Sequence, residues 1–344
     1  MSVAELVRPE IRALKSYVPA PPHPHAIRLN ANESAAAGNG LHRYPEFGPG
    51  QLHTRLAHHF SVPESNLLVT RGSSEAIDLL LRAFCRAGVD NVVISPPTFE
   101  MYRVYADIQG ATAISVPLAP ASDFRLDAGE ILDACTAESK LIFVCSPNNP
   151  SGTLVPAEVI EEIVVARQKQ SVVVVDEAYL EFSQAPSVAE SIRRFDNLVV
   201  LRTLSKAQGL AGARCGVAIA RAPVISILGS ILSPFAISTP TVDCVLEALS
   251  DDGRRQAAAA VATTIAERER LATLLGRLGS VERCWRSHAN FLLVRFRDID
   301  LVHRRLRAAN IVVREFGQQE ALNNCVRITV GTAVENDALL KALS

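Results

Sequence analysis

The sequence predicts an α/β protein: a large, mostly parallel sheet wrapped by helices, and a smaller α+β domain. Segments of strand and helix character alternate between residues 67 and 220, which is the pattern of a parallel sheet covered by helices. Val172–Val175 is a continuous β-branched run, typical of a strand buried on both faces. A long helical stretch over 253–278 then leads into a second group of strands and helices. With 344 residues and 48% hydrophobic content, the chain is large enough for two domains.

The N-terminal segment is expected to form an extended arm. Residues 1–30 contain several prolines, which favour an extended chain over a helix: Pro19, Pro21, Pro22 and Pro24. A polar loop that contains glycine follows Leu29–Glu33 and ends at Gly40. We assign residues 1–40 to this arm and to a contribution to the small domain.

Residues 41–252 are assigned to the large domain. Its expected strands are Leu67–Thr70, Asn91–Ser95, Ala113–Val116, Lys140–Cys145, Val172–Val175, Leu198–Leu201 and Cys215–Ala220. Its expected helices are Leu52–Phe60, Ser73–Arg86, Phe99–Gln109, Asp127–Cys135 and Pro156–Gln170, and another that begins at Thr239-Pro240. Ser73 is the expected N-cap of its helix, and Pro240 suits a first helical position.

Residues 253–344 are assigned to the small α+β domain. The Arg- and Ala-rich stretch Gly253–Leu278 predicts a connecting helix. The expected strands are Asn290–Phe296, Ile311–Glu315 and Val326–Val330, and the expected helices are Asp298–Ala309 and Val334–Leu343. No internal repeat or low-complexity segment interrupts this order.

Composition excludes several classes of partner. The formal net charge of -1 gives no sign of a nucleic acid or an acidic membrane surface. The N-terminus has no apolar core of signal-peptide length and no segment is long enough to span a bilayer, so we expect a soluble, cytoplasmic protein. The 7 cysteines form no CxxC pair and lie near no His cluster, which indicates buried reduced thiols and no metal site.

One lysine stands at the end of a predicted strand. The run Leu198–Leu201 stops at a polar elbow that carries Thr203, Ser205 and Lys206, and Arg214 follows eight positions after the lysine. Hydroxyls and a guanidinium hold a phosphate dianion through charge-assisted bonds. A lysine beside such a pocket suggests a Schiff base with pyridoxal phosphate (PLP). The alternative is a surface lysine in a turn, although the chain has only five lysines.

Four other strand ends carry polar or aromatic residues, and ligands collect at the carboxyl ends of strands in such sheets. Thr70–Glu75 places a glycine and two serines at a helix N-terminus, which is either an anion site or an ordinary cap. Phe99 could stack on a ring or belong to the core. Asn149 lies between two prolines in a turn. Asp176 ends a buried strand, where a carboxylate is costly unless it is paired, and a pyridinium nitrogen would be a suitable partner.

The order of these motifs resembles that of the fold-type I PLP-dependent aminotransferases. Asn149–Gly152, Asp176–Tyr179 and Ser205-Lys206 with Arg214 carry the resemblance. Within that family the chain is similar to the branch that acts on histidinol phosphate, whose motifs match Leu29–Glu33, Arg43–Glu46, Cys145–Gly152, Asp176–Phe182, Leu201–Gly216 and Val326–Thr332. The resemblance runs from about residue 10 to the C-terminus. Two departures stand out: Ser74 replaces the usual aspartate, and the loop Ser34–Leu41 lacks the usual proline-rich form.

The resemblance implies a role for each matching residue. Lys206 would form the Schiff base and later move the proton of the reaction, and Asp176 would keep the ring nitrogen protonated. Tyr179 and Asn149 would hydrogen-bond O3′ of the cofactor, and Phe99 would stack on its ring. The cofactor phosphate would be surrounded by Ser73, Ser74, Thr203, Ser205 and Arg214.

The resemblance also implies a substrate site and a partner subunit. The residues expected to bind the substrate, including its phosphate, are Tyr17, Asn32, Arg314 and Arg327. Tyr44 would reach the cofactor phosphate of the neighbouring subunit, so the resemblance implies a homodimer with shared active sites.

The implied reaction converts histidinol phosphate and 2-oxoglutarate to imidazole-acetol phosphate and glutamate, a step of histidine biosynthesis. The alternatives are an aromatic amino-acid aminotransferase on the same scaffold and a PLP-dependent lyase such as a threonine-phosphate decarboxylase. A transcription regulator with an aminotransferase-like domain would need a DNA-binding domain, for which the short N-terminal arm leaves no room. The sequence leaves the amino donor open between histidinol phosphate and an aromatic amino acid.

Overall fold

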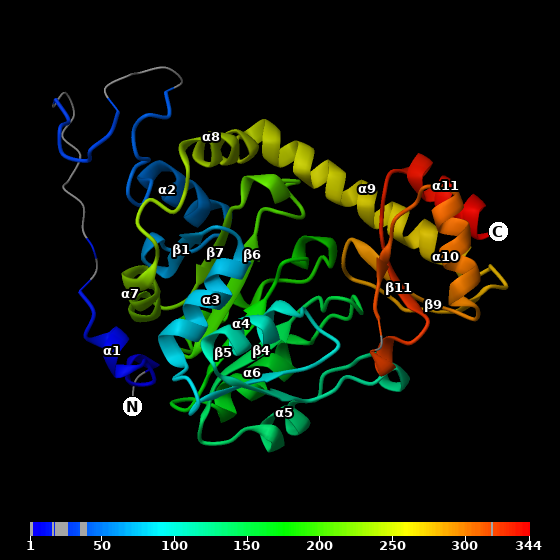
Figure 1. Ribbon diagram of the computed structural model, residues 1–344, viewed down its shortest axis with the longest axis horizontal. Coiled ribbons are helices and arrows are strands. Elements are labelled where there is room, and N and C mark those ends of the chain that lie inside the picture. The colour runs from blue at the N-terminus through cyan, green and yellow to red at the C-terminus, as the bar shows by residue number, and fades with distance from the viewer. Residues whose placement is uncertain (1–2, 16, 18–26, 35–39, 318) are drawn as a thin grey trace.

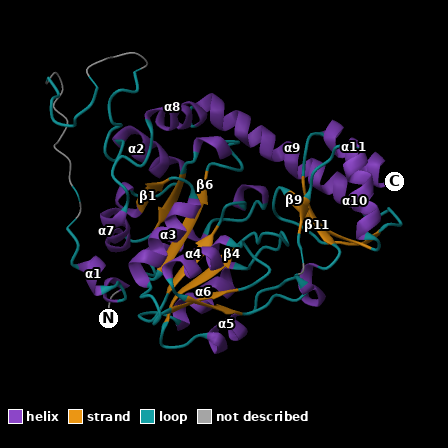
Figure 2. Ribbon diagram, viewed as in Figure 1, coloured by secondary structure: helices purple, strands orange, loops and turns teal. Residues whose placement is uncertain are grey.

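The computed structural model describes residues 3–15, 17, 27–34, 40–317 and 319–344. It consists of a large lobe and a small lobe joined by the long helix α9 (Asp251–Leu275), as Figures 1 and 2 show. The predicted α/β architecture with a large, mostly parallel sheet and a smaller α+β unit is confirmed. The boundaries that we assign at residues 40 and 252 stay predictions.

The large lobe is built on a seven-stranded sheet with the order β1-β7-β6-β5-β4-β2-β3. The strands are β1 (Leu67–Thr70), β2 (Asn91–Ile94), β3 (Thr112–Ser115), β4 (Ser139–Cys145), β5 (Val172–Asp176), β6 (Leu198–Thr203) and β7 (Gly216–Ile219). Only β7 runs antiparallel to its neighbours β1 and β6. The carboxyl ends of the six other strands therefore lie at one edge of the sheet.

Helices cover both faces of this sheet (Figure 2). They are α2 (Gly50–His59), α3 (Ser73–Phe84), α4 (Met101–Gln109), α5 (Ala128–Ala134), α6 (Ala157–Ala166), α7 (Ala222–Ile231) and α8 (Thr239–Ala248). Along β5, Val173 and Val175 pack into one hydrophobic core and Val172 and Val174 into the other. Successive side chains of a strand point to opposite faces, so burial of both faces explains the unbroken valine run.

The small lobe is a four-stranded antiparallel sheet with the order β10-β11-β9-β8. Its strands are β8 (Val281–Cys284), β9 (Phe291–Phe296), β10 (Arg314–Glu315) and β11 (Cys325–Thr329), and its helices are α10 (Ile299–Ala308) and α11 (Ala333–Leu343). Its core includes Leu271 and Leu275 from the end of α9. Helix α7 and strand β8 are absent from the sequence prediction, and β10 is shorter than the strand expected at Ile311–Glu315.

The described start of the chain packs against the large lobe. It forms the short turns η1 (Val3–Glu5) and α1 (Pro9–Arg12), whereas we expected an extended arm that contributes to the small domain. Val3 and Val7 are buried in the core that contains α3 and α7, and this apolar contact explains the difference. The prolines at 19–24 and most of the loop Ser34–Leu41 lie outside the described residues.

Three further observations concern the composition. All seven cysteines are described as free thiols. Cys85, Cys145, Cys215 and Cys325 are buried, whereas Cys135 and Cys284 are half-buried and Cys244 is exposed, so the expectation of burial holds for only part of the set. No helix in the described ranges is long and apolar enough to cross a membrane. Nor does any group of three or more His, Cys, Asp and Glu side chains in this part of the chain lie close enough to hold a metal ion.

Candidate active site

A cavity opens at the carboxyl ends of β4, β5 and β6, next to the N-terminus of α3. Its lining includes all predicted cofactor-binding residues except Tyr44: Ser73, Ser74, Phe99, Asn149, Asp176, Tyr179, Thr203, Ser205, Lys206 and Arg214. The other lining residues are Gly72, Cys145, Ala178 and Ala211. These residues come from five separate segments. The strand order brings them together, because the parallel strands end at the same edge.

The lysine elbow is held by its own hydroxyl groups. Thr203 is 4% exposed; its hydroxyl accepts a bond from the Ser205 N–H at 3.1 Å and donates to the Ser205 hydroxyl at 2.9 Å. The Gly209 N–H donates to the carbonyl of Lys206 at 3.1 Å and closes the turn. The elbow is therefore fixed by local bonds, and Lys206 projects from it into the cavity.

The amine of Lys206 is easier to deprotonate than that of a free lysine. Partial burial lowers its pKa, the Arg327 and Arg214 guanidiniums lower it further, and Asp176 opposes them. Its Nζ lies 5.5 Å from the centroid of the Tyr179 ring. An amine with a lowered pKa is neutral, and therefore nucleophilic, at lower pH.

The N-terminus of α3 forms one end of the cavity. The N-cap is Gly72 and not Ser73, which is the first helical residue. Gly72 has φ +82° and supplies no side-chain cap, so the first N–H groups of the helix are free for a ligand. A Cβ on Gly72 would lie 2.9 Å from Nη2 of Arg214. A Cβ on Gly216 would lie 2.8 Å from the backbone N of Ser73. Both glycines thus allow a guanidinium and a strand to approach this helix end, which gives an anion site.

Asp176 lies at the end of β5, the neighbour of the strand β6 that leads into the lysine elbow. It is 3% exposed, and its carboxylate accepts bonds from the Tyr102 hydroxyl at 2.9 Å and from the Ala178 N–H at 3.1 Å. Burial raises its pKa, against the effect of these two donors. No Arg, Lys or His in the described part of the chain forms an ion pair with it. A buried carboxylate without a cationic side chain as partner is suited to bind a cationic ligand.

Asn149 and Tyr179 form the side of the cavity that faces the small lobe. Asn149 is 8% exposed, and its Oδ1 accepts a hydrogen bond from Nη1 of Arg327 on β11. The Tyr179 ring meets Phe291 of β9 edge to face, with the centroids 5.1 Å apart. Burial raises the pKa of the Tyr179 phenol, so this group is a hydrogen-bond donor at neutral pH.

Two arginines of the small lobe lie directly opposite each other. Arg314 on β10 and Arg327 on β11 are register partners in the antiparallel pair. Side chains at such positions share a face, and like charges there are destabilising unless something compensates them. In this structure Arg314 lies 3.5 Å from Oε2 of Glu100, and Gln319 donates to Oε1 of the same carboxylate at 3.1 Å. Arg314 and Glu100 are both more than half exposed, so this pair is weak.

Besides Arg314 and Arg327, three predicted residues lie outside the lining of this cavity. Tyr17 is 60% exposed, and Asn32 is exposed with φ 53°. Tyr44 is 53% exposed and stacks on Phe235, with the ring centroids 5.0 Å apart. The roles that we predict for these three residues stay predictions.

Sequence reasoning missed two residues that support the site. Tyr102 is fully buried and holds Asp176. Asn148 donates to the carbonyl of Pro97 at 3.0 Å and accepts from the Thr98 hydroxyl at 2.8 Å, which ties the segment before Phe99 to the segment of Asn149. The signal available for Asn148 was its place in the Ser146–Thr153 turn. For Tyr102 the helical periodicity indicates only a core position.

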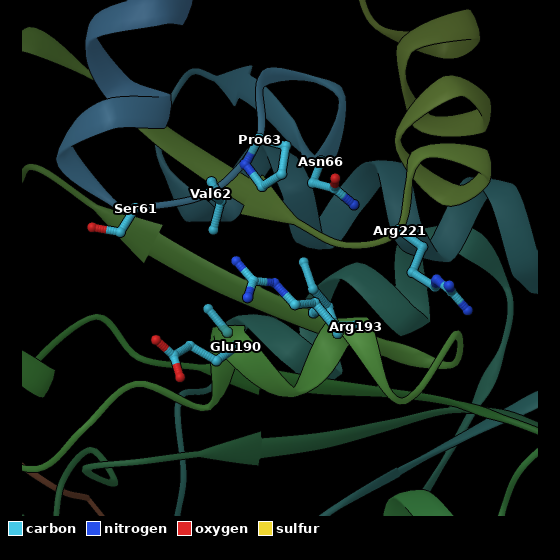
Figure 3. A pocket seen from close by; sticks show the side chains of 9 residues that line it. Ser61, Val62, Pro63, Asn66, Glu190, Arg193 and Arg221 are labelled. Atoms are coloured by element: carbon cyan, nitrogen blue, oxygen red, sulfur yellow. The ribbon is translucent and has the colours of Figure 1, made fainter.

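A second hollow lacks this convergence of groups. This hollow (Figure 3) is lined in part by Asn66, Arg193 and Arg221, which lie near the amino ends of β1 and β6 and the end of β7. It is therefore at the opposite edge of the sheet. The guanidinium groups of Arg193 and Arg221 point in different directions (Figure 3), so they do not form a common anion site.

The donor set of the cavity fits PLP. The cofactor has an anionic phosphate, a basic ring nitrogen, a phenolic oxygen and an aldehyde. The cavity offers, in the same order, the helix end with Arg214, the buried Asp176, the donors Tyr179 and Asn149, and the amine of Lys206. Phe99 lies beside them as an aromatic surface.

Comparison with known proteins supports the same conclusion. The family model for aminotransferase class I and II matches residues 14–343. The chain is 44% identical to the histidinol-phosphate aminotransferase of Stenotrophomonas maltophilia (strain R551-3), over 99% of this chain and 96% of that protein. It is 42% identical to the histidinol-phosphate aminotransferase of Xylella fastidiosa (strain 9a5c), over 99% and 96% of the two chains.

A solved structure is similar over most of its length. It is the histidinol-phosphate aminotransferase of Sinorhizobium meliloti in complex with pyridoxal-5′-phosphate. The TM-score is 0.80 with 26% sequence identity, and the match covers 88% of this chain and 83% of the other.

Proposed function

The chain belongs to the aminotransferase class I and II family, and on that premise we propose that it moves an amino group from histidinol phosphate to 2-oxoglutarate with PLP as cofactor. The products are imidazole-acetol phosphate and glutamate, which places the enzyme in histidine biosynthesis. The names of the relatives with 44% and 42% identity support this donor. We further propose that it works in the cytoplasm as a homodimer.

The residues at the helix end bind the cofactor phosphate in this proposal. Free N–H groups of α3 and the Arg214 guanidinium supply donors and positive charge, and hydroxyls complete the site: Ser73, Ser74, Thr203 and Ser205. Ser74 keeps a hydroxyl where the family usually has an aspartate. It therefore adds no negative charge beside the phosphate.

Asp176, Tyr179 and Asn149 bind the ring of the cofactor. The carboxylate of Asp176 keeps the ring nitrogen protonated, and Tyr179 and Asn149 donate to the phenolic oxygen. When bound, PLP supplies an electron-accepting ring that stabilises negative charge on the substrate carbon next to the nitrogen. Asp176 strengthens that effect because a protonated ring nitrogen accepts electrons more readily.

Lys206 has two tasks. Its neutral amine would hold the cofactor through the aldehyde carbon. With a substrate amine bound in its place, Nζ of Lys206 would be positioned to move a proton to or from the substrate carbon. The lowered pKa serves both tasks, since each needs an amine that can lose and regain a proton near neutral pH.

The observation that carries the choice of donor is the pairing of Arg314 with Arg327 across β10 and β11. Two guanidiniums on one face suit a phosphate dianion better than a single carboxylate. Arg327 also contacts Asn149 and therefore reaches the cavity. Tyr17 and Asn32 complete the substrate site in the proposal, and Gln319 and Glu100 lie at its edge.

A donor panel tests the proposal. The purified holoenzyme is given histidinol phosphate, phenylalanine or tyrosine, each with 2-oxoglutarate, and glutamate and CO2 are measured. We expect glutamate formation with a kcat/KM that is highest for histidinol phosphate. A preference for phenylalanine or tyrosine would instead identify an aromatic amino-acid aminotransferase, and release of CO2 without glutamate would identify a lyase.

A further inference from the structure

Helix α9 runs from the large lobe to the small lobe (Figure 1) and carries a buried arginine. Arg268 is 5% exposed, and its Nη1 donates to the carbonyl of Phe182 at 3.0 Å and to the carbonyl of Ala289 at 2.9 Å. Phe182 belongs to the large lobe, in the turn that follows β5. Ala289 belongs to the small lobe, just before β9. One side chain therefore ties the two lobes together beside the cavity.

The two carbonyl groups belong to residues of a small apolar cluster, of which Ala178 and Tyr179 line the cavity. The buried members of this cluster come from the segment after β5, from the lysine elbow and from the start of β9: Ala178, Tyr179, Phe182, Ala207, Ala289 and Phe291. The Phe182 N–H donates to the carbonyl of Tyr179 at 3.1 Å, and Ala289 stands two residues before Phe291. Arg268 thus holds the backbone on both sides of the contact between Tyr179 and Phe291.

The bonding of Arg268 differs from that of an ordinary ion pair. Among the described residues it forms an ion pair with Glu269 alone, whose side chain is 67% exposed. Burial of a charged side chain costs folding free energy. An apolar side chain of similar size at the same position often stabilises a protein equally well or better. An apolar side chain cannot hold two carbonyl groups at a fixed separation, whereas the planar guanidinium can. The bonds therefore indicate a positional role more than a stabilising one.

We propose that Arg268 is a positioning residue for the active site: by holding Phe182 and Ala289 together it fixes Phe291 against Tyr179 and so sets the position of the Tyr179 hydroxyl. The inference rests on the proposed function, in which this hydroxyl donates to the phenolic oxygen of the cofactor. Loss of the two bonds would let the small lobe shift against Tyr179. Small displacements of a group that contacts the reacting atoms can slow a reaction strongly.

The first test compares Arg268→Met with Arg167→Met. Arg167 is 9% exposed and donates to the carbonyl of Thr136 and the hydroxyl of Ser171, so all of its bonds lie inside the large lobe. Three quantities are measured on the PLP-loaded proteins: the pH midpoint of the cofactor absorbance, the melting temperature, and kcat and KM. For Arg268→Met we expect the midpoint to move by about half a pH unit or more, and kcat to fall roughly tenfold or more. Arg167→Met should lower the melting temperature without moving the midpoint.

A second test shows whether the effect passes through Tyr179. Arg268→Lys retains a positive charge and can keep one of the two bonds, so it should fold and give a smaller shift of the midpoint than Arg268→Met. In a Tyr179→Phe background, Arg268→Lys should cause little further shift of the midpoint, because the hydroxyl that it would displace is absent.

The outcomes separate this inference from the proposed function. If Tyr179→Phe moves the midpoint but neither Arg268 variant does, or if Arg167→Met moves it equally, Arg268 is merely structural. Equal shifts by Arg268→Lys with and without the Tyr179 hydroxyl would also overturn the inference. If Tyr179→Phe itself leaves the midpoint unchanged, the role proposed for Tyr179 is wrong and the inference falls with it, while the donor panel still decides the reaction.

Discussion

The hydroxyl of Tyr102 donates a hydrogen bond of 2.9 Å to the carboxylate of Asp176. Tyr102 lies on α4, and its ring stacks on Phe143 with centroids 4.7 Å apart and meets Phe99 at a right angle. One side chain therefore supports both the carboxylate proposed to hold the ring nitrogen and the aromatic ring proposed to stack on the cofactor. This relation makes Tyr102 the first target for mutation.

Tyr102→Phe keeps the ring and removes the donor. Burial raises the pKa of Asp176, and the Tyr102 bond lowers it, so loss of the bond should make the carboxylate harder to keep ionised. A hydrogen bond to a charged group contributes about 1.5–3 kcal/mol, and we expect kcat to fall roughly tenfold or more. The measurement is kcat at saturating PLP. Tyr105→Phe, on the same helix but not bonded to Asp176, is the matched control and should retain wild-type turnover.

Asp176→Asn should keep the fold and still bind PLP, yet turn over far more slowly. An amide cannot stabilise a positive ring nitrogen, so the ring would accept less of the negative charge that forms on the substrate carbon. Loss of such a buried ion pair costs several kcal/mol, on the order of a hundredfold or more in rate. Steady-state kinetics together with the absorbance of bound cofactor check this. Near wild-type turnover in a cofactor-saturated variant would remove Asp176 from the mechanism.

The sequence was informative where burial leaves a regular pattern. Val172–Val175 is apolar at every position because both faces of β5 are covered, and Asp176 breaks that run where the strand reaches the cavity. Lys206 likewise lies in a polar segment that directly follows the mostly apolar strand β6. In a parallel sheet the carboxyl ends share one edge, so a list of strand ends already predicts which segments meet.

The missed features have weak local patterns. In β8 only Val281 is buried, so no alternation marks the strand. Helix α7 is apolar over most of its length, which leaves little contrast between its faces. Tyr102 and Asp176 are separated by 74 positions, and the bond between them follows from the fold alone. Arg268 is one of many arginines in the chain, and its burial becomes visible only once both lobes are placed around α9.

The pH dependence of cofactor capture tests the environment of Lys206. Because burial and the Arg327 guanidinium lower its pKa, the amine of the cofactor-free protein becomes neutral at a lower pH than a free lysine. The rate of covalent attachment of PLP should therefore rise with pH through a midpoint below the ordinary value of 10.5. Arg327→Met removes one of the charges that lower the pKa and should move this midpoint upward.

Borohydride reduction followed by peptide mapping supplies the control for that experiment. The label should be found on Lys206 and be lost in Lys206→Ala. Attachment to another lysine, or a midpoint that Arg327→Met leaves in place, would contradict the role assigned to this site.

Arg314 tests the choice of substrate. Arg314→Ala removes one of two facing guanidiniums and leaves Arg327, which also suits a carboxylate. A charge-assisted contact contributes about 1.5–3 kcal/mol, so KM for histidinol phosphate should rise roughly ten- to a hundredfold while any activity on phenylalanine changes little. Initial rates with both donors measure this. Arg304→Ala, on the neighbouring helix α10, serves as the control for loss of one positive charge from the small lobe.

Glu100→Gln tests the same substrate site by a change that should strengthen the binding of histidinol phosphate. In the structure the Glu100 carboxylate lies next to Arg314 and Gln319, where a substrate phosphate would compete with it. Removal of that charge should lower KM for histidinol phosphate about twofold or more, because an exposed ion pair contributes up to about 1 kcal/mol. Equal changes of KM for both donors in the Arg314 and Glu100 variants would favour an aromatic donor.

Tyr44 tests whether the active site is shared between two subunits. It is half exposed, does not line the cavity of its own chain, and stacks on Phe235 beside the partly exposed Phe47. These apolar rings form a surface patch of the kind that associates with another protein. If the patch contacts a second copy and Tyr44 reaches the cofactor phosphate there, Tyr44→Ala should weaken PLP binding in a homodimer without changing Lys206.

Mixed dimers give the decisive measurement. Lys206→Ala and Tyr44→Ala proteins, each of low activity alone at limiting PLP, are unfolded and refolded together. In a mixed dimer one site combines the intact Lys206 of one chain with the intact Tyr44 of the other, so about half of the sites in such dimers should recover wild-type PLP affinity and turnover. Refolding of either variant with itself is the control. If Tyr44 acts on its own chain, every site in the mixed dimer lacks one of the two groups, and activity will not exceed the mean of the two controls.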